Sequence, residues 1–203
     1  MLPIINNIKR PLRWIRRFRK RRGYGIHSPF AFQWVTGVVY ERGVYYAYKE
    51  LAEQFKAAQH HVRLKDLQLL FRITNAHNPK ATLAIGQGND FEQTCRYMNA
   101  AHHMAFHAYT SLKDYEAHET TSTFEMVYIE EHLEPEHLAL LQSLAHDRLL
   151  IIVRQPRLNA TTKQTWQQLC KHTWVRQSFD LHDYGVCFCE ERLNKEHFII
   201  NYY

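Results

Sequence analysis

The chain has 203 residues, with 26 lysines and arginines against 20 acidic residues, so its formal net charge is +6 at pH 7. This length is most simply one domain, and a hydrophobic content of 45% is enough for a core. No stretch reaches the roughly 18 apolar residues of a membrane-spanning helix. The first residues lack a secretory signal pattern, so we expect a cytoplasmic protein.

The positive charge is concentrated at one end of the chain. Nine of the 26 lysines and arginines lie within residues 1–40, which contain no acid. The other 17 face 20 acids in the rest of the chain, a balance of −3. The isoelectric point of about 9.1 therefore describes one segment. Nucleic acid is not an expected partner, because the remaining surface is not basic and no nucleic-acid-binding motif is present.

Residues 4–22 have the pattern of a basic amphipathic helix. Apolar residues fall on one side at helical spacing: Ile4, Ile5, Ile8, Leu12, Ile15 and Phe18. Three interpretations remain open: this segment packs on its own domain, binds a partner protein, or lies on a polyanion such as an anionic membrane surface through residues 9–22. In the last case the protein is membrane-peripheral. The contacts would then come from Arg13, Arg16, Arg17 and Lys20.

Three further helices are predicted before residue 80. Ser28 is a good N-cap and Pro29 a good first helical residue, so a helix is expected to begin there. The expected helices cover residues 29–40, 44–58 and 63–76. Asn78-Pro79 should end the last of them. Residues 1–80 are therefore predicted to form an N-terminal helical extension.

Beyond residue 80 strands and helices alternate, which favours a parallel sheet with crossover helices. Strands are expected over residues 81–86, 104–109, 124–129 and 148–154, and helices over 89–100, 135–146 and 160–172. The segments 174–181, 185–190 and 197–202 have no long helix between them, so we expect an antiparallel C-terminal end with Gly185 in a turn. Residues 81–203 should thus form an α/β, Rossmann-like domain.

The first of these strands ends in a glycine-rich turn. Gly86-Gln87-Gly88 follows an apolar run, and a helical pattern begins at Asn89. Glycines at such a turn let the backbone approach a ligand, and the helix N-terminus offers free N–H groups. The same pattern also fits an ordinary strand–turn–helix corner.

This order of elements resembles the class I S-adenosylmethionine-dependent methyltransferases. More specifically, the run Gly25-Ile26-His27-Ser28-Pro29-Phe30 resembles the N-terminus of a methyltransferase-like family common in Bacteroidetes. Similar landmarks of that family are found at Arg21–Tyr24, Val39–Glu41, Tyr45–Tyr48, Leu70–Arg72 and Lys195–Phe198. The resemblance implies a Rossmann-like methyltransferase sheet in which Gly86, Gly88 and Asn89 border the cofactor.

The chain departs from the family at the residues that hold this cofactor. The family's acid before the glycine turn is matched by Ala84, and no carboxylate ends the strand that finishes at Ala108-Tyr109. An acid does survive at Glu130, but Arg154-Gln155-Pro156-Arg157 replaces a common acid pair. Only about 15 residues separate the second strand from the next, too few for the usual helix, strand and helix. We therefore expect the family's third strand to be missing.

These losses favour a degenerate methyltransferase that no longer binds S-adenosylmethionine, so no cofactor is expected. Such a chain would act as a non-catalytic interaction protein, with an unknown protein partner or as a homodimer through the edge left by the missing strand. The alternative is an active O-methyltransferase-like enzyme that uses S-adenosylmethionine on an unknown acceptor. Glu130 would then orient or deprotonate the acceptor. Glu130-Glu131 also fits a solvated pair before a helix at Pro135.

The cysteines and histidines indicate no metal site, because their spacing does not match a metal-ligand pattern. Cys187-Phe188-Cys189 alternates as a strand does, which places both thiols on one face. We expect buried, reduced thiols. No residue other than Glu130 is a candidate for a catalytic role.

Overall fold

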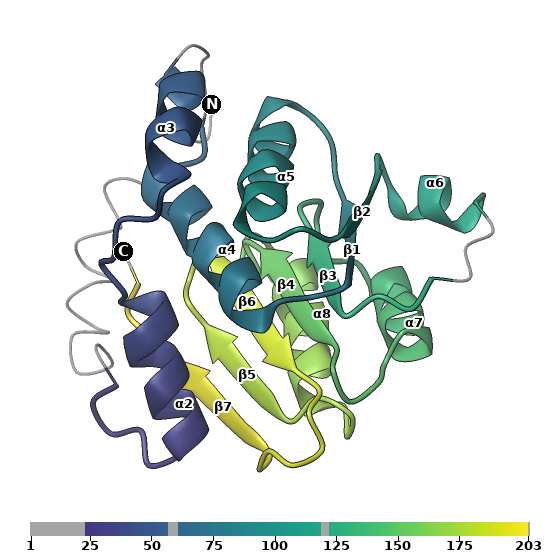
Figure 1. Ribbon diagram of the computed structural model, residues 1–203. Coiled ribbons are helices and arrows are strands. Elements are labelled where there is room, and N and C mark those ends of the chain that lie inside the picture. Colours follow the sequence, from purple (N-terminus) through teal and green to yellow (C-terminus); the bar gives the residue numbers. More distant parts are fainter. Residues whose placement is uncertain (1–22, 57–60, 119–121, 203) are drawn as a thin grey trace.

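The computed structural model describes residues 23–56, 61–118 and 122–202. Its centre is a seven-stranded sheet in the order β2-β1-β3-β4-β6-β5-β7 (Figure 1). The strands are β1 Ala81–Ile85, β2 Ala105–Tyr109, β3 Met126–Ile129, β4 Leu150–Arg154, β5 Gln177–Asp180, β6 Tyr184–Phe188 and β7 Glu196–Ile199. Only β6 runs against the others, since it is antiparallel to β4 and β5 while β7 is parallel to β5. The predicted mostly parallel sheet with an antiparallel C-terminal element is confirmed.

The predicted loss of one strand is visible at the β2 edge. Between β2 and β3 the described residues contain one short helix, α6 (Leu112–Glu116), and no strand. The sheet order ends at β2, which pairs with β1 alone. The predicted absence of a third strand is therefore confirmed in the described part of this connection, which is too short to return to the sheet edge.

The helices follow the predicted order. They are α2 Pro29–Trp34 with a π-helical turn at Val35–Val39, α3 Tyr48–Lys56, α4 Leu64–His77, α5 Asn89–Ala101, α7 Pro135–Ser143 and α8 Ala160–Lys171. Ser28 caps α2 by accepting a hydrogen bond from the Ala31 amide at 3.3 Å, and Asn78 ends α4 in the left-handed conformation. The third helix begins at Tyr48 instead of residue 44, because Val44 and Tyr46 are 91% and 88% exposed and give a helix there no face to bury.

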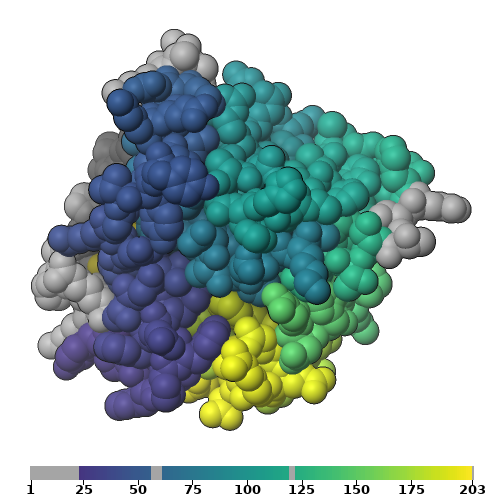
Figure 2. Space-filling model, in the orientation of Figure 1, coloured from purple at the N-terminus to yellow at the C-terminus, as the bar shows by residue number. Residues whose placement is uncertain are grey.

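Helices cover both faces of the sheet (Figure 1). On the face with α2, α4 and α5, side chains such as Trp34, Leu70 and Phe91 pack on Ile152 and Phe179 in one core. The N-terminal helices therefore share this core with the sheet. Figure 2 shows them, in purple and blue, beside α5 on the molecular surface.

The opposite face packs against α7 and α8. Val127, Ile151 and Cys187 point into this second core and meet Leu141 and Trp166. Successive strand residues alternate between the two cores, as expected for a sheet buried on both faces.

Gly185 corrects one prediction, because it lies inside β6 and the turn between β5 and β6 is formed by His182 and Asp183. The reason for glycine is close packing. A Cβ atom on Gly185 would lie 2.5 Å from the ring of the fully buried Trp166.

The predicted basic helix at residues 4–22, with Arg13, Arg16, Arg17 and Lys20, lies outside the described residues. In the part of the chain that is described, no helix has the length and apolarity needed to cross a membrane.

Candidate functional site

The candidate site lies where the carboxyl ends of β1, β3 and β4 meet. The parallel register places Ile85 beside Ile129 and Ile129 beside Val153, so the residues that follow them are neighbours. These are Gly86, Glu130 and Arg154. The Glu130 amide donates to the Ile85 carbonyl at 2.8 Å, which holds Glu130 directly against the turn.

The structure separates the three predicted cofactor-binding residues. Gly86 is buried, and a Cβ atom there would lie 2.5 Å from Glu130 Cβ and 2.7 Å from the ring of Phe91. Gly88 caps α5 with a positive φ of 88° and has open space beside it. Asn89 begins α5 and is exposed. The protein's own side chains therefore fill the approach to Gly86, and of the three predicted residues only Gly88 and Asn89 are exposed.

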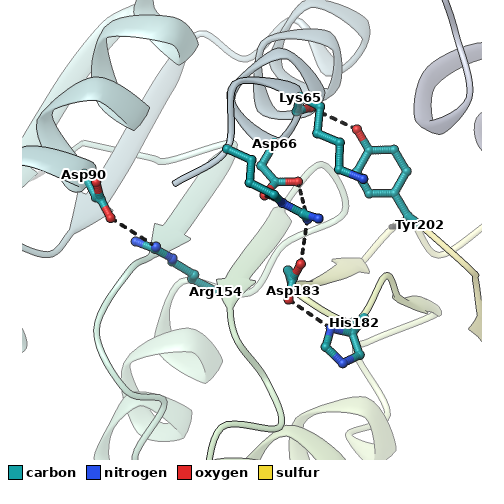
Figure 3. A network of polar contacts seen from close by, with 8 residues as sticks. Lys65, Asp66, Asp90, Arg154, His182, Asp183 and Tyr202 are labelled. Carbon is teal, nitrogen blue, oxygen red and sulfur yellow. Dashed lines mark hydrogen bonds and ion pairs between the residues drawn. The ribbon is translucent and has the colours of Figure 1, made fainter. Parts of the chain in front are cut away.

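An ion-pair network covers this turn. Arg154 pairs with Glu130. Its Nη2 also lies 3.4 Å from Asp90 Oδ2 (Figure 3). The side chains of Arg154, Glu130 and Asp90 are only 17%, 8% and 17% exposed. Glu130 also accepts a hydrogen bond from the Tyr128 hydroxyl, and Asp90 accepts one from the His61 amide at 3.0 Å. Both carboxylates near Gly86 are thus engaged by the same guanidinium.

The interpretation of Glu130-Glu131 as a solvated pair was wrong for Glu130, whose side chain is 8% exposed, whereas the side chain of Glu131 is 30% exposed. Glu130 is buried in the network above. Glu131 lies 2.8 Å from Nε2 of the buried His137 and accepts a hydrogen bond from the Leu112 amide at 3.2 Å. Arg154 and Leu112, which contact these carboxylates, lie far from them in the sequence. The residues next to Glu130 and Glu131 in the chain therefore do not indicate these contacts.

A second network, which the sequence did not predict, lies at the same carboxyl end of the strands. Arg63 donates to both oxygens of Asp66, at 2.6 and 2.7 Å, and to Asp183 at 2.6 Å. Asp183 in turn contacts His182 Nδ1 at 2.9 Å (Figure 3). Burial raises the pKa of Asp66, and Arg63 opposes that rise. The spacing of Arg63 and Asp66 is a local signal for a helical pair, but no local signal indicates Asp183.

Two residues beside these networks have strained backbones. Gln155, after β4, has a φ of 47°, and His182, in the β5–β6 turn, has a φ of 78°. The left-handed conformation costs a non-glycine residue about 1–2 kcal/mol. The Gln155 amide donates to the Asp183 carbonyl at 2.7 Å. This hydrogen bond joins the loop after β4 to the β5–β6 turn and stabilises both strained conformations.

Two hollows lie at the other end of the sheet, beside the segment that leads into β4. One has a volume of about 460 Å³ and the other about 440 Å³. The first is lined by residues that include Asp147, Trp174 and Arg176, the second by residues that include Trp34, His77 and Arg148. Among the described residues, no three His, Cys, Asp or Glu side chains gather in a way that could hold a metal ion.

No protein-family profile and no curated protein sequence matches this chain. Solved structures do resemble it. A proposed O-methyltransferase from Klebsiella pneumoniae superposes with a TM-score of 0.51 at 13% identity, covering 78% of this chain and 98% of that one. The chain has the Rossmann-like methyltransferase fold.

Weaker likenesses have TM-scores of 0.48. The O-methyltransferase TomG from Streptomyces achromogenes, solved with S-adenosylmethionine, is 14% identical over 73% of this chain and 91% of that one. The methyltransferase PaMTH1 from Podospora anserina, solved with S-adenosylhomocysteine, is 10% identical over 81% of this chain and 97% of that one.

Proposed function

We propose that this chain is a non-catalytic interaction protein on a methyltransferase fold and that it no longer binds S-adenosylmethionine usefully. It would be a degenerate relative of the methyltransferase-like family common in Bacteroidetes, which its Gly25–Phe30 run resembles. The observation that carries the proposal is the Arg154–Glu130 pair over Gly86, where the cofactor's methionine end would have to enter.

The residues at this site do not fit the charged part of the cofactor. The family's acid helps to hold the charged methionine end of the cofactor, yet its place is taken here by Ala84, buried in the core, and Ala108 offers no acid for the ribose. The nearest carboxylates, Asp90 and Glu130, are engaged by Arg154. A cofactor would have to displace this guanidinium, and breaking an ion pair that is largely but not fully shielded from water costs about 2–4 kcal/mol.

The size of the missing contacts supports the proposal. A charge-assisted hydrogen bond contributes about 1.5–3 kcal/mol. Losing two or three of them weakens binding about 10³-fold or more, because about 1.4 kcal/mol is a factor of ten. A micromolar cofactor would then bind in the millimolar range, too weakly to support catalysis.

Isothermal titration with S-adenosylmethionine and S-adenosylhomocysteine tests this. We expect no binding tighter than about 1 mM. A dissociation constant of about 100 μM or tighter would overturn the proposal. The variant Asn89→Trp places a large side chain at the exposed start of α5, beside the turn, so loss of any such binding in this variant would assign the ligand to this site. Glu130→Gln would then test Glu130 as the acceptor's base in an active methyltransferase.

For the interaction itself, we propose that two copies of the chain pair through β2. The amide of Ala105 donates to the carbonyl of Lys80, just before β1, at 3.0 Å. By the alternation of a strand, Phe106 and Ala108 therefore direct their backbone groups to the outer edge. In an antiparallel pair centred on His107, Phe106 would face the partner's Ala108 and Tyr109 the partner's Ala105. Each aromatic side chain would then meet a small one. Light scattering of the full chain is expected to give twice the mass of one chain.

The basic segment at residues 9–22 supports a second candidate, binding to an anionic membrane surface. Its nine cations without an acid would contribute up to about 1 kcal/mol each near such a surface. We expect the full chain to sediment with vesicles rich in phosphatidylserine. Substituting Arg13, Arg16, Arg17 and Lys20 with glutamate should abolish sedimentation, and equal sedimentation of the variant would contradict this candidate.

A further inference from the structure

The exposed apolar side chains of this protein are concentrated in one segment, residues 23–47, which we call the outer segment. In the described part of the chain, five large hydrophobic side chains are exposed, and four of them lie in this segment: Tyr24, Phe32, Val44 and Tyr46. The fifth is Leu158, in the loop before α8. Single exposed apolar residues are normal on a protein surface, whereas a group of them in one short segment indicates an interaction surface.

The loop before α3 directs two of these side chains away from the protein. Tyr45 points inward, since its ring centroid lies 5.0 Å from that of Phe71 and 5.3 Å from that of Tyr48. Its neighbours on either side, Val44 and Tyr46, are almost fully exposed. The loop therefore alternates between an anchoring side chain and two that project into solvent.

The other two exposed aromatic side chains lie at the start of α2. Ala31 and Trp34 of this helix are buried, while Phe32 faces outward and is 48% exposed. A Cβ atom on Gly23 would lie 2.8 Å from the Phe32 ring, so this ring covers the turn before the helix. Tyr24 follows Gly23 directly and is 77% exposed. These two aromatic residues therefore belong to the same part of the surface.

The inner side of the outer segment is fixed to the rest of the protein. Arg72 on α4 donates to the carbonyl of Val38 at 2.8 Å and to that of Val39 at 3.1 Å. The hydroxyl of Tyr40 donates to the carbonyl of Asn201. Figure 2 shows the segment, in purple and blue, along one side of the molecule. The exposed side chains are therefore presented along this side from a backbone that is held in place.

The charges in and before the outer segment favour an anionic partner. Residues 23–47 contain one acid, Glu41, which accepts a hydrogen bond from the Tyr45 hydroxyl at 2.8 Å. The nine lysines and arginines of residues 9–22 directly precede Gly23, with no acid among them. Tyrosine is enriched where a bilayer meets water, and clustered cations attract anionic lipid headgroups. Apolar and cationic groups are thus adjacent in the chain, as binding to an anionic bilayer requires.

We propose that the outer segment lies on an anionic bilayer and that Tyr24, Phe32, Val44 and Tyr46 enter its headgroup region. This inference rests on the membrane candidate given under the proposed function. It adds an apolar contribution, which salt does not screen, to the attraction by the cations, which salt does screen. A partner protein or a second copy of the chain would use the same side chains without lipid.

Sedimentation with vesicles of phosphatidylcholine and phosphatidylserine tests the apolar contribution. The full-length double variant Val44→Ser with Tyr46→Ser should bind about tenfold more weakly than the wild type, a change of about 1.4 kcal/mol. Both side chains are exposed, so the substitutions should leave the fold intact. Leu158→Ser is the matched control, because it removes an exposed apolar side chain outside the outer segment, and it should bind as the wild type does.

The outcomes separate this inference from the membrane candidate on which it rests. A wild type that does not sediment, or that sediments no better than the glutamate variant of the basic segment, would overturn both. Loss of sedimentation in the glutamate variant, together with wild-type binding of the double serine variant, would overturn the inference alone. Equal weakening by Leu158→Ser would also overturn it, because the contact would then not be specific to the outer segment.

Fluorescence quenching by brominated lipid tests where the loop lies. The variants Tyr46→Trp and Leu158→Trp each add one tryptophan at an exposed position to the same four native tryptophans. On vesicles that contain brominated phosphatidylcholine, Tyr46→Trp should lose a larger share of its fluorescence than Leu158→Trp does. Equal quenching of the two variants would mean that the loop before α3 stays outside the bilayer, as contact with a protein partner predicts, and would overturn the proposal.

Discussion

Arg154 and Glu130 form an ion pair at the ends of two neighbouring strands, β4 and β3, and both side chains are largely buried. The pair closes the approach to Gly86, the glycine of the turn that Glu130 and Phe91 cover. Its stability decides whether a cofactor could open this site.

Arg154→Ala should destabilise the protein by about 2–4 kcal/mol, because Glu130 would remain buried without its cation and the pair is not fully shielded from water. The measurement is the free energy of unfolding in urea. Arg148→Ala is the control: Arg148 is 54% exposed and lies 3.4 Å from Glu125, so its loss should cost less than about 1 kcal/mol. The double variant Arg154→Met with Glu130→Gln should recover most of the lost stability. An equal effect of Arg154→Ala and Arg148→Ala would contradict the buried pair.

Gly185→Ala should destabilise the protein by about 1–3 kcal/mol, because the added methyl group overlaps the ring of Trp166 in a closed core. Gly37→Ala is a matched control, since nothing lies within 4 Å of its Cβ position and the residue is helical. The control should be neutral or stabilising by up to about 1 kcal/mol. Thermal unfolding compares the two, and a tolerated alanine at position 185 would show that β6 and α8 can separate.

His77 should make the protein less stable in acid. Its Nε2 lies 2.9 Å from the Glu125 carbonyl and 3.1 Å from the Arg148 carbonyl, and burial lowers its pKa below the ordinary 6.5. The unfolded chain therefore binds a proton at a higher pH than the folded chain does. The contribution of His77 is present above about pH 6.5 and is lost as the pH falls toward the folded-state pKa.

The comparison that isolates this effect uses His77→Gln, which keeps a donor for the carbonyls but does not titrate. Urea unfolding of both proteins between about pH 5 and pH 7 should show a smaller loss of stability in the variant. Equal pH dependence in the two proteins would mean that His77 titrates alike in the folded and unfolded states.

Ala108→Lys should keep the chain as a single copy in solution. Charged residues on an edge strand oppose strand-to-strand pairing, and Ala108 is exposed on β2. Ala139→Lys, at an exposed position of α7, is the control and should keep the mass of two copies. Light scattering measures both. A wild-type mass of one chain, or equal masses for the variants, would argue against pairing through β2.

Sequence alone predicted most of the fold, because its signals act over a few residues. Ser28-Pro29 fixed the start of α2, and Asn78 the end of α4. The short connection after Tyr109 indicated the missing strand, since chain length limits what can be built. The prediction that placed Gly185 in a turn was wrong because a local signal was used for a non-local effect. A glycine usually indicates a turn, but here glycine is needed because Trp166, 19 residues earlier in the chain, packs against it.

The sequence by itself thus determined the order and type of the elements and showed that positions 84 and 108 hold alanine and no acid. Only the tertiary structure decided what fills the site, because the partners come from separate elements: Arg154 meets Asp90 across 64 positions, and Arg63 meets Asp183 across 120. Propensity and periodicity describe residues close in the sequence, whereas these ion pairs join the ends of separate strands and helices. The pairing of parallel strands brings those ends together, and the sequence of one segment does not specify that pairing.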